Sequence, residues 1–374
     1  MNHPVQHTAL RALGIFAVFL LLDFSAGKPR AVDVPLPLTL WVSIAGFFIL
    51  WMCSIRAWGL SFARWAGEGE QPLGVQLALG SVLFALLAWV FAFTGLLKPE
   101  LRFLLFAFQA IALAMHPIRL PAKPGIELLL WVPLALLFAL NVLDSFVVHP
   151  YWDPLHHHLV GPRLFWERGR MYFPETAIAS YQEGGFELLF LWPHFYFAKA
   201  GGLGLLPVQI FAQLTHVVLG FGGSLLAAHA LAKIWLPSPS WRALAVTLFA
   251  IPASLQFAIP TAKNDWGIVL WIMAGLWLLG QAAKRPAGLG GLLFGFAFLA
   301  KVSAGFTLVG MPLLFFFRRG TYRSFAFFLA GCLLGALPLA WRNWSATGDP
   351  LFPLLGRQFF EPTYGPTWRD ALAI

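Results

Sequence analysis

The sequence predicts an all-α polytopic membrane protein, and its composition and hydropathy pattern are the grounds for this fold class. Hydrophobic residues make up 59% of the 374 residues, charged residues only 11%, and the mean hydropathy is +0.74. So little charge cannot cover the surface of a soluble protein, whereas a bilayer is itself an apolar solvent. Apolar runs close to the ~20 residues that span hydrocarbon recur along the chain, and we expect about 11 transmembrane helices.

The N-terminal region, residues 1–148, holds the clearest of these runs. They are Ala9–Leu22, Leu38–Ile55, Gly74–Leu97 and Ile126–Val148. With one more span between the third and the fourth, we expect about five crossings here.

The cations fall in short loops between the apolar runs and set the expected orientation, because Lys and Arg are enriched in cytoplasmic loops. The cations assigned to the cytoplasm are Arg56, Arg64, Arg119, Lys123, Lys233, Arg242, Lys284, Arg285, Arg318, Arg319 and Arg323. The fifth span then leads to the outer face. The net charge of +9 reflects this orientation and contact with membrane lipids, and does not indicate nucleic-acid binding.

Residues 149–205 are expected to form an outer-face loop with interfacial helices. Within it, the apolar run Phe186–Ala200 is short and contains a proline. It ends in Lys199 and glycines, so we expect a helix that lies in the membrane interface and does not cross it.

Residues 206–353 are expected to form a membrane core of about six spans. The stretch Gly288–Phe317 is too long for one good span and carries Lys301 at its centre, so we expect two short spans with Lys301 at their outer bend. Residues 354–374 follow as a short C-terminal tail.

The outer loop holds the densest group of ionisable residues in the chain, between Trp152 and Glu175. Asp153-Pro154 is a good helix start, with Asp as N-cap and Pro at the first helical position. Asp153 is therefore either a cap or an acid presented to a ligand.

An amphipathic helix follows this start. Its expected apolar face consists of Leu155, Leu159, Pro162 and Trp166. The charged residues Arg163, Glu167 and Arg170 point elsewhere, as in a helix that lies along a membrane surface. The neighbouring histidines 156–158 diverge by ~100° each on a helix and cannot share one zinc ion, so the alternative for each is an interfacial histidine near headgroups.

A second polar group occupies the turn from Pro260 to Trp266. Asn264 or Asp265 is either an N-cap or a functional residue. Lys263 beside a helix N-terminus is a plausible phosphate seat, because the helix dipole and its free N–H groups favour an anion there.

Other polar residues are expected in the outer half of the membrane. Lys301 and Arg342 either bind a substrate or extend to lipid phosphates. Gln209, Gln213 and His216 share one helix face, where interhelical hydrogen bonds and a polar cavity are equally good explanations.

The sequence lacks the motifs of cofactor and metal chemistry. It contains no Walker loop, no HExxH or GxSxG motif and no dinucleotide fingerprint. Cys53 and Cys332 lie in or beside apolar runs and are expected to be packing residues. We therefore expect no cofactor and no metal site.

These polar residues resemble the motifs of GT-C membrane glycosyltransferases. The segment Asp153-Pro-Leu-His-His-His158 and Pro162-Arg-Leu-Phe-Trp-Glu-Arg-Gly-Arg170 is similar to the first outer-loop motif of a bacterial branch. That branch comprises protein O-mannosyltransferases, the aminoarabinose transferase of lipid A and Rgt-type lipopolysaccharide sugar transferases. The resemblance covers about residues 144–355. Further matches follow in order at Glu187, His216, Asp265, Gly295–Lys301 and Trp341–Pro353.

The resemblance implies an inverting enzyme of the bacterial inner membrane that takes a sugar from a polyprenyl-phosphate donor at the outer face. It assigns Asp153 as the base or as the residue that orients the acceptor, which would be a glycan such as lipopolysaccharide, a lipid or a protein. The leaving group is a lipid phosphate, which needs cations nearby and no protonating acid. The implied substrate-binding residues are His157, His158, Glu187, His216, Lys263, Asp265, Lys301 and Arg342.

Three features depart from the family pattern. The usual loop tyrosine is His157, and a second acid found in some branches is Pro154. About five spans precede the loop, where the best-known members have one. Many relatives continue further, so a truncated chain that lacks an acceptor-binding part is one expectation.

Two other functions remain open. A transporter or flippase of lipid-linked sugars would place paired polar residues or broken helices near mid-membrane. In a non-catalytic subunit of an envelope-assembly complex, Asp153 would be only a cap.

Overall fold

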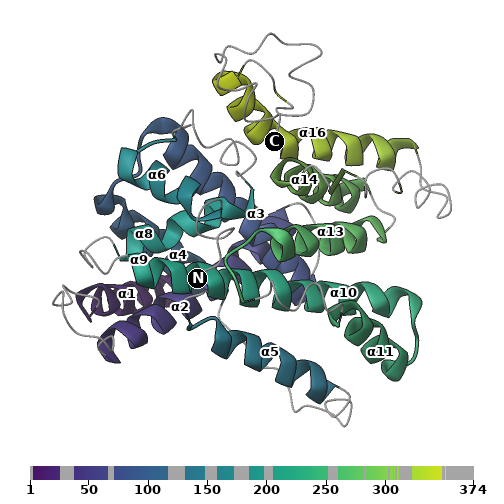
Figure 1. The fold of residues 1–374 in the computed structure, drawn as a ribbon, viewed down its shortest axis with the longest axis horizontal. Coiled ribbons are helices and arrows are strands. Elements are labelled where there is room, and N and C mark those ends of the chain that lie inside the picture. The colour runs from purple at the N-terminus through teal and green to yellow at the C-terminus, as the bar shows by residue number, and fades with distance from the viewer. Residues whose placement is uncertain are drawn as a thin grey trace, which may run out of the picture.

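The computed structural model of the chain is a bundle of helices (Figure 1). Among the residues that it describes there is no β-strand, which confirms the predicted all-α class for this part of the chain. The described residues are 3–25, 38–65, 71–116, 131–147, 158–171, 185–197, 205–251, 260–281, 284–301, 304–305, 307, 310, 322–347 and 350.

The N-terminal half of the bundle consists of apolar helices. They are α1 (His3–Ser25), α2 (Leu38–Trp65), α3 (Leu73–Thr94), α4 (Arg102–Met115) and α5 (Val132–Asp144), with the short 3-10 helix η1 (Pro99–Leu101) before α4. Glycines allow α2 and α3 to pack closely. A side-chain carbon on Gly59 would lie 1.8 Å from the carbonyl oxygen of Gln76, and one on Gly80 would lie 1.9 Å from that of Ile55. Small residues at such a contact let two helix backbones approach.

The C-terminal half is built around one long helix. Its parts are α9 (Leu205–Leu214), the π-helix η6 (Thr215–Gly222) and α10 (Gly223–Trp235). The further helices are α11 (Pro239–Ala250), α13 (Asp265–Leu279), α14 (Lys284–Ala300) and α16 (Tyr322–Thr347). Figure 1 shows α10, α13, α14 and α16 stacked in this order, and each packs against the next.

The helices α14 and α16 run parallel and in close contact. A side-chain carbon on Gly291 would lie 2.0 Å from the carbonyl oxygen of Phe328, and one on Gly295 would lie 2.1 Å from that of Cys332. The contact therefore advances along both helices in the same direction. The outer bend expected at Lys301 agrees with the end of α14 at Ala300, whereas most of the expected return to α16 lies outside the described residues.

The long apolar helices are compatible with an integral membrane protein. Within the described part of the chain, four helices are long and apolar enough to cross a membrane: Leu38–Trp65, Leu73–Thr94, Leu205–Trp235 and Tyr322–Ser345. Shorter apolar helices cover Arg11–Leu22, Val132–Asp144, Asp265–Leu279 and Pro286–Phe298. The expected total of about 11 spans stays a prediction.

The structure describes most of the segment Phe186–Ala200 as two short helices. They are the 3-10 helix η4 (Phe186–Leu191) and α8 (Trp192–Tyr196), and every residue from 185 to 197 is buried in the protein, while the expected place at the membrane interface stays a prediction. Both elements pack within the bundle, η4 against α3, α6 (Val160–Arg168) and α9. Most of its side chains are apolar, and its polar residues Glu187 and His194 are themselves buried, so the segment turns no polar face toward water.

Chain segments meet at two opposite ends of the bundle, which we call the Lys301 end and the Arg56 end. The Lys301 end holds the C-terminus of α14, the N-terminus of α13, and α6. Directly after α6, Gly169 accepts a hydrogen bond from Leu97, and Met171 donates one to Ala92 in the last turn of α3. The Arg56 end holds the second half of α2, the N-terminus of α3 and the C-terminus of α10. The η6–α10 helix connects the two ends, since its rise separates His216 from His229 by about 20 Å.

Candidate functional site

The candidate site lies at the Lys301 end, where four separate segments of the chain meet. They are the residue His158 before α6, the first turn of η4, the turn 260–265 before α13, and Lys301 after α14. His158, Glu187 and Asn264 form one set of contacts, and Asp265 and Lys301 form a second beside it.

A buried carboxyl, that of Glu187, is the centre of these contacts. Glu187 is 1% exposed, and its Oε1 lies 3.0 Å from Nδ1 of His158. The same oxygen accepts a hydrogen bond of 2.5 Å from Nδ2 of Asn264. The second oxygen of the carboxyl, Oε2, is buried and has no hydrogen-bond partner among the described residues. The carboxyl therefore ties the segment before α6 to the turn before α13.

An ion pair between Lys301 and Asp265 lies beside this network. The side chains of Lys301 and Asp265 are 46% and 33% exposed, so the pair is open at the end of the bundle while Glu187 is closed off. His216 and His158 are also near enough to act electrostatically on the Asp265 carboxyl. The pair is thus the accessible part of the site, and Glu187 is its buried support.

The side chains in the turn before α13 make contacts with other segments of the chain. Asn264 occupies the N-cap position, but its side chain makes no capping hydrogen bond. It donates to Glu187 and, at 3.4 Å, to the carbonyl of Ala300. Asp265 is the first helical residue and pairs with Lys301. Neither residue is merely a helix cap, and the contact of Asn264 with Glu187 was not predicted.

The polar face of the long helix forms interhelical hydrogen bonds. The amide nitrogen Nε2 of Gln213 donates to the carbonyls of Val147 and Pro260, each at 3.0 Å. The backbone N–H of Trp266 donates to Nε2 of His216 at 3.2 Å, and His216 is fully buried. His216 lies within the π-helix η6, and such irregular turns are frequent at functional sites.

The helix α6 is held against the buried core. Phe165 is buried and Trp166 stacks on His194 of α8 with ring centroids 5.7 Å apart. On the opposite side, exposed Arg163 pairs with exposed Glu167 at 2.7 Å, which confirms the predicted amphipathic helix for residues 160–168. Burial, with the charge of Arg163 adding to it, lowers the pKa of His194 to about 3, so this imidazole is neutral.

Four other predicted residues lie apart from these contacts or outside the described part of the chain. Arg342 is 1% exposed in α16 and donates to Oδ1 of Asn343 at 2.9 and 3.1 Å, which excludes the alternative of a side chain extended to lipid phosphates. Lys263 is half-buried in the turn before α13. Asp153 and His157 lie outside the described residues.

The accessible groups of the site are the Lys301–Asp265 ion pair and the N-terminus of α13. Among the described residues, no three His, Cys, Asp or Glu side chains are grouped as metal ligands. An accessible lysine beside a helix N-terminus offers a phosphate both a charge and backbone N–H groups. Comparisons of the chain with protein-family models, with curated proteins and with solved structures found no match.

Proposed function

We propose that the chain is an integral membrane glycosyltransferase that moves a sugar from a polyprenyl-phosphate donor to an acceptor at the outer face of the membrane. One observation carries the proposal. His158, Glu187, Asp265 and Lys301, which the resemblance to GT-C enzymes selects from distant segments, lie together at one end of the bundle. An accessible cation at this site could stabilise the negative charge of a lipid phosphate as it leaves.

In this proposal Lys301 serves the leaving group. The departing lipid phosphate is already a stable anion, so a positioned cation stabilises it without a proton transfer. Lys301 would exchange its contact with Asp265 for the phosphate, and Lys263 with the N-terminus of α13 would complete the seat. Asp153 would act on the acceptor hydroxyl as base or orienter, a role that contributes about 10²–10⁴-fold to a rate.

The buried network would set the position of the acceptor side of the reaction. His158 follows Asp153 by five residues, and its contact with Glu187 anchors that end of the loop to η4. Asn264, the residue before Asp265, donates a hydrogen bond to the same carboxyl. Glu187 would therefore be a positioning residue that keeps the donor and acceptor groups in register.

A transporter or flippase of lipid-linked sugars is the second candidate function. The observation in its favour is the π-helix in the Leu205–Trp235 helix, with buried His216 and Gln213 beside it. Interrupted helices with polar groups are typical of transport sites. The clustering of the remaining polar residues at one end of the bundle favours the enzyme.

The test compares surface glycans and lipid-linked sugars by mass spectrometry in a strain that lacks the protein. The strain is complemented at matched membrane levels with wild type, Asp153→Asn or Lys301→Met. The exposed residues Glu100 and Lys98 provide the matched controls Glu100→Gln and Lys98→Met. We expect both site variants, and neither control, to leave one sugar missing from a glycan while its polyprenyl-phosphate donor accumulates.

Two results would contradict the proposal. Full complementation by Asp153→Asn would make Asp153 a helix cap, because Asn caps nearly as well as Asp. If purified wild-type protein moved the lipid-linked sugar across vesicle membranes without transferring it to any acceptor, the transporter would be the better description.

A further inference from the structure

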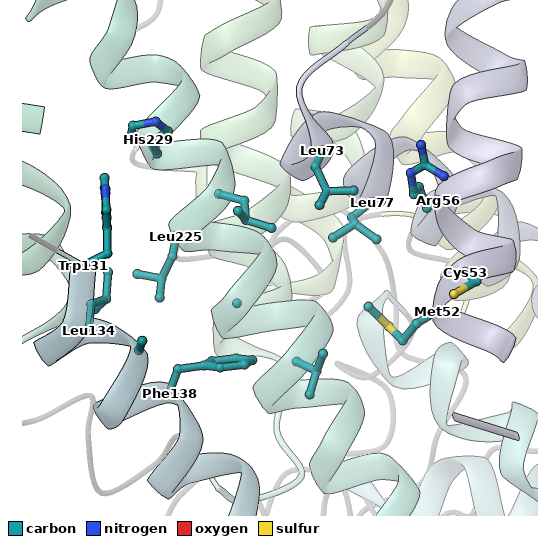
Figure 2. Close-up of a pocket in the computed structure, with 14 residues that line it drawn as sticks. Met52, Cys53, Arg56, Leu73, Leu77, Trp131, Leu134, Phe138, Leu225 and His229 are labelled. Atoms are coloured by element: carbon teal, nitrogen blue, oxygen red, sulfur yellow. The ribbon is translucent and has the colours of Figure 1, made fainter. Parts of the chain in front are cut away.

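A large apolar pocket lies at the opposite, Arg56 end of the bundle. Its volume is about 910 Å³, and α2, α3, α5 and the η6–α10 helix form its walls. Figure 2 shows its lining, which is almost entirely aliphatic, aromatic or sulfur-containing. Such a volume lies within the range of about 300–1,000 Å³ that is usual for ligand sites.

The few polar groups of the pocket gather at one of its ends. In Figure 2, Arg56 and His229 lie toward one end, whereas Met52 and Phe138 lie toward the other. Nη1 of Arg56 is buried and has no hydrogen-bond partner among the described residues. His229 contacts the ring of Trp131 edge-on, with centroids 4.9 Å apart. The pocket is therefore a trough for an apolar chain with a cation at its mouth.

A neighbouring hollow extends the cationic mouth. It has a volume of about 510 Å³ and shares Leu73, Leu226 and His229 with the larger pocket. Lys233 also lines it, and among the described residues no Asp or Glu lines either cavity. A ligand with an anionic head at this mouth would lie close to the cations of Arg56 and Lys233.

We infer that this pocket binds an anionic phospholipid, with an acyl chain in the apolar trough and the headgroup phosphate between Arg56 and Lys233. Water does not fill an apolar cavity of this kind, whereas lipid chains surround a membrane protein. Basic pockets between membrane helices are a known form of recognition for anionic headgroups. The orientation predicted from the cations places this mouth in the cytoplasmic leaflet. The inference does not depend on the proposed transferase activity.

The test measures lipid binding to the purified full chain by native mass spectrometry and by thermal stability in detergent. The probes are phosphatidylglycerol, phosphatidylcholine with the same chains, and glycerol phosphate without chains. We expect phosphatidylglycerol to bind and to raise the unfolding midpoint more than phosphatidylcholine does. Glycerol phosphate alone is expected to have no effect.

Two variants separate the head from the chain. Arg56→Gln is expected to weaken phosphatidylglycerol about fivefold and leave phosphatidylcholine unchanged, since one cation near a lipid phosphate contributes about this factor. Arg64→Gln, on the same helix but outside the pocket, is the matched control. Ala135→Trp should block both lipids, because Ala135 lines the pocket and its own side chain is exposed, so the change fills space without disturbing the core.

Three results would overturn the inference. One is equal binding of the two phospholipids to wild type, and another is unchanged phosphatidylglycerol binding in monodisperse Ala135→Trp protein. The third is competition by glycerol phosphate, which would identify a site for free phosphate. If Arg56→Gln fails to fold, the comparison of headgroups in wild type and the Ala135→Trp variant still decides the question.

Discussion

The contact between His158 and Glu187 can be tested by a double-mutant cycle. The changes are His158→Leu, Glu187→Gln, and both together. His158→Leu removes one of the two described partners of a carboxyl that is 1% exposed, while Asn264 remains bonded to the same oxygen. In the Glu187→Gln background the same change removes a contact with a neutral amide.

The expected energies follow from the type of contact that is lost. A hydrogen bond to a charged group contributes about 1.5–3 kcal/mol, and a neutral one about 0.5–1.5 kcal/mol. We therefore expect His158→Leu to cost about 2 kcal/mol in wild type and about 1 kcal/mol in Glu187→Gln. The unfolding entropy, about 2.1 cal/mol/K per residue, is about 0.8 kcal/mol/K for this chain. The two shifts of the unfolding midpoint are then about 2–3 °C and about 1 °C.

The assay is thermal unfolding of the purified variants in one detergent at one heating rate, followed by size-exclusion chromatography of the protein that remains folded. A fixed rate is needed because large membrane proteins often unfold irreversibly. Equal shifts in the two backgrounds would mean that the two residues do not interact, and would refute the assigned contact. Arg163→Leu, at an exposed ion pair of α6, is the control and should change the midpoint little.

Two further predictions concern packing and pH. Gly295→Ala is expected to destabilise the protein by about 1–3 kcal/mol, because the new methyl group would meet the backbone of α16 at Cys332. The control is Gly14→Ala, whose methyl group would meet nothing within 4 Å and should be neutral or slightly stabilising in the same thermal assay. Because the pKa of His194 is lowered to about 3 in the folded chain, the contribution of its neutral imidazole to stability is complete above about pH 6.5 and is lost as the pH falls. At pH 5 the loss is about 2 kcal/mol. His194→Phe should therefore reduce the fall of the unfolding midpoint between pH 7 and pH 5.

Much of the fold was predictable because hydropathy and helix-start signals act locally. The apolar runs of residues 38–55 and 74–97 became α2 and α3, and the turn at 260–264 begins α13 as expected. The burial of the segment 186–197 was not predicted, because a short apolar run with a proline suits both a surface helix and a buried one. What decides between them is the cover supplied by α3, α6 and α9, which no local pattern contains.

The candidate site was predictable in its members more than in its contacts. Resemblance selected Glu187, His216 and Asp265, but the role of Asn264 as the partner of Glu187 depends on the packing of α13 against the interior of the bundle. The sequence could not predict that the side chain of Asn264 makes no capping hydrogen bond, since Asn is a preferred N-cap residue. The pocket at Arg56 was missed for a similar reason, because a cation after a span indicates orientation first.

The π-helix η6 has a geometric consequence for both ends of the bundle. A π-helix closes i→i+5 hydrogen bonds, so the stretch Thr215–Gly222 holds more residues per turn than the α-helices on either side of it. His216, near the start of this stretch, accepts the hydrogen bond from the backbone of Trp266, whereas Leu225 and His229, beyond its end, line the pocket. The direction in which His229 points toward the pocket, relative to that of His216 toward the polar site, is thus set by the number of residues in one irregular stretch of helix.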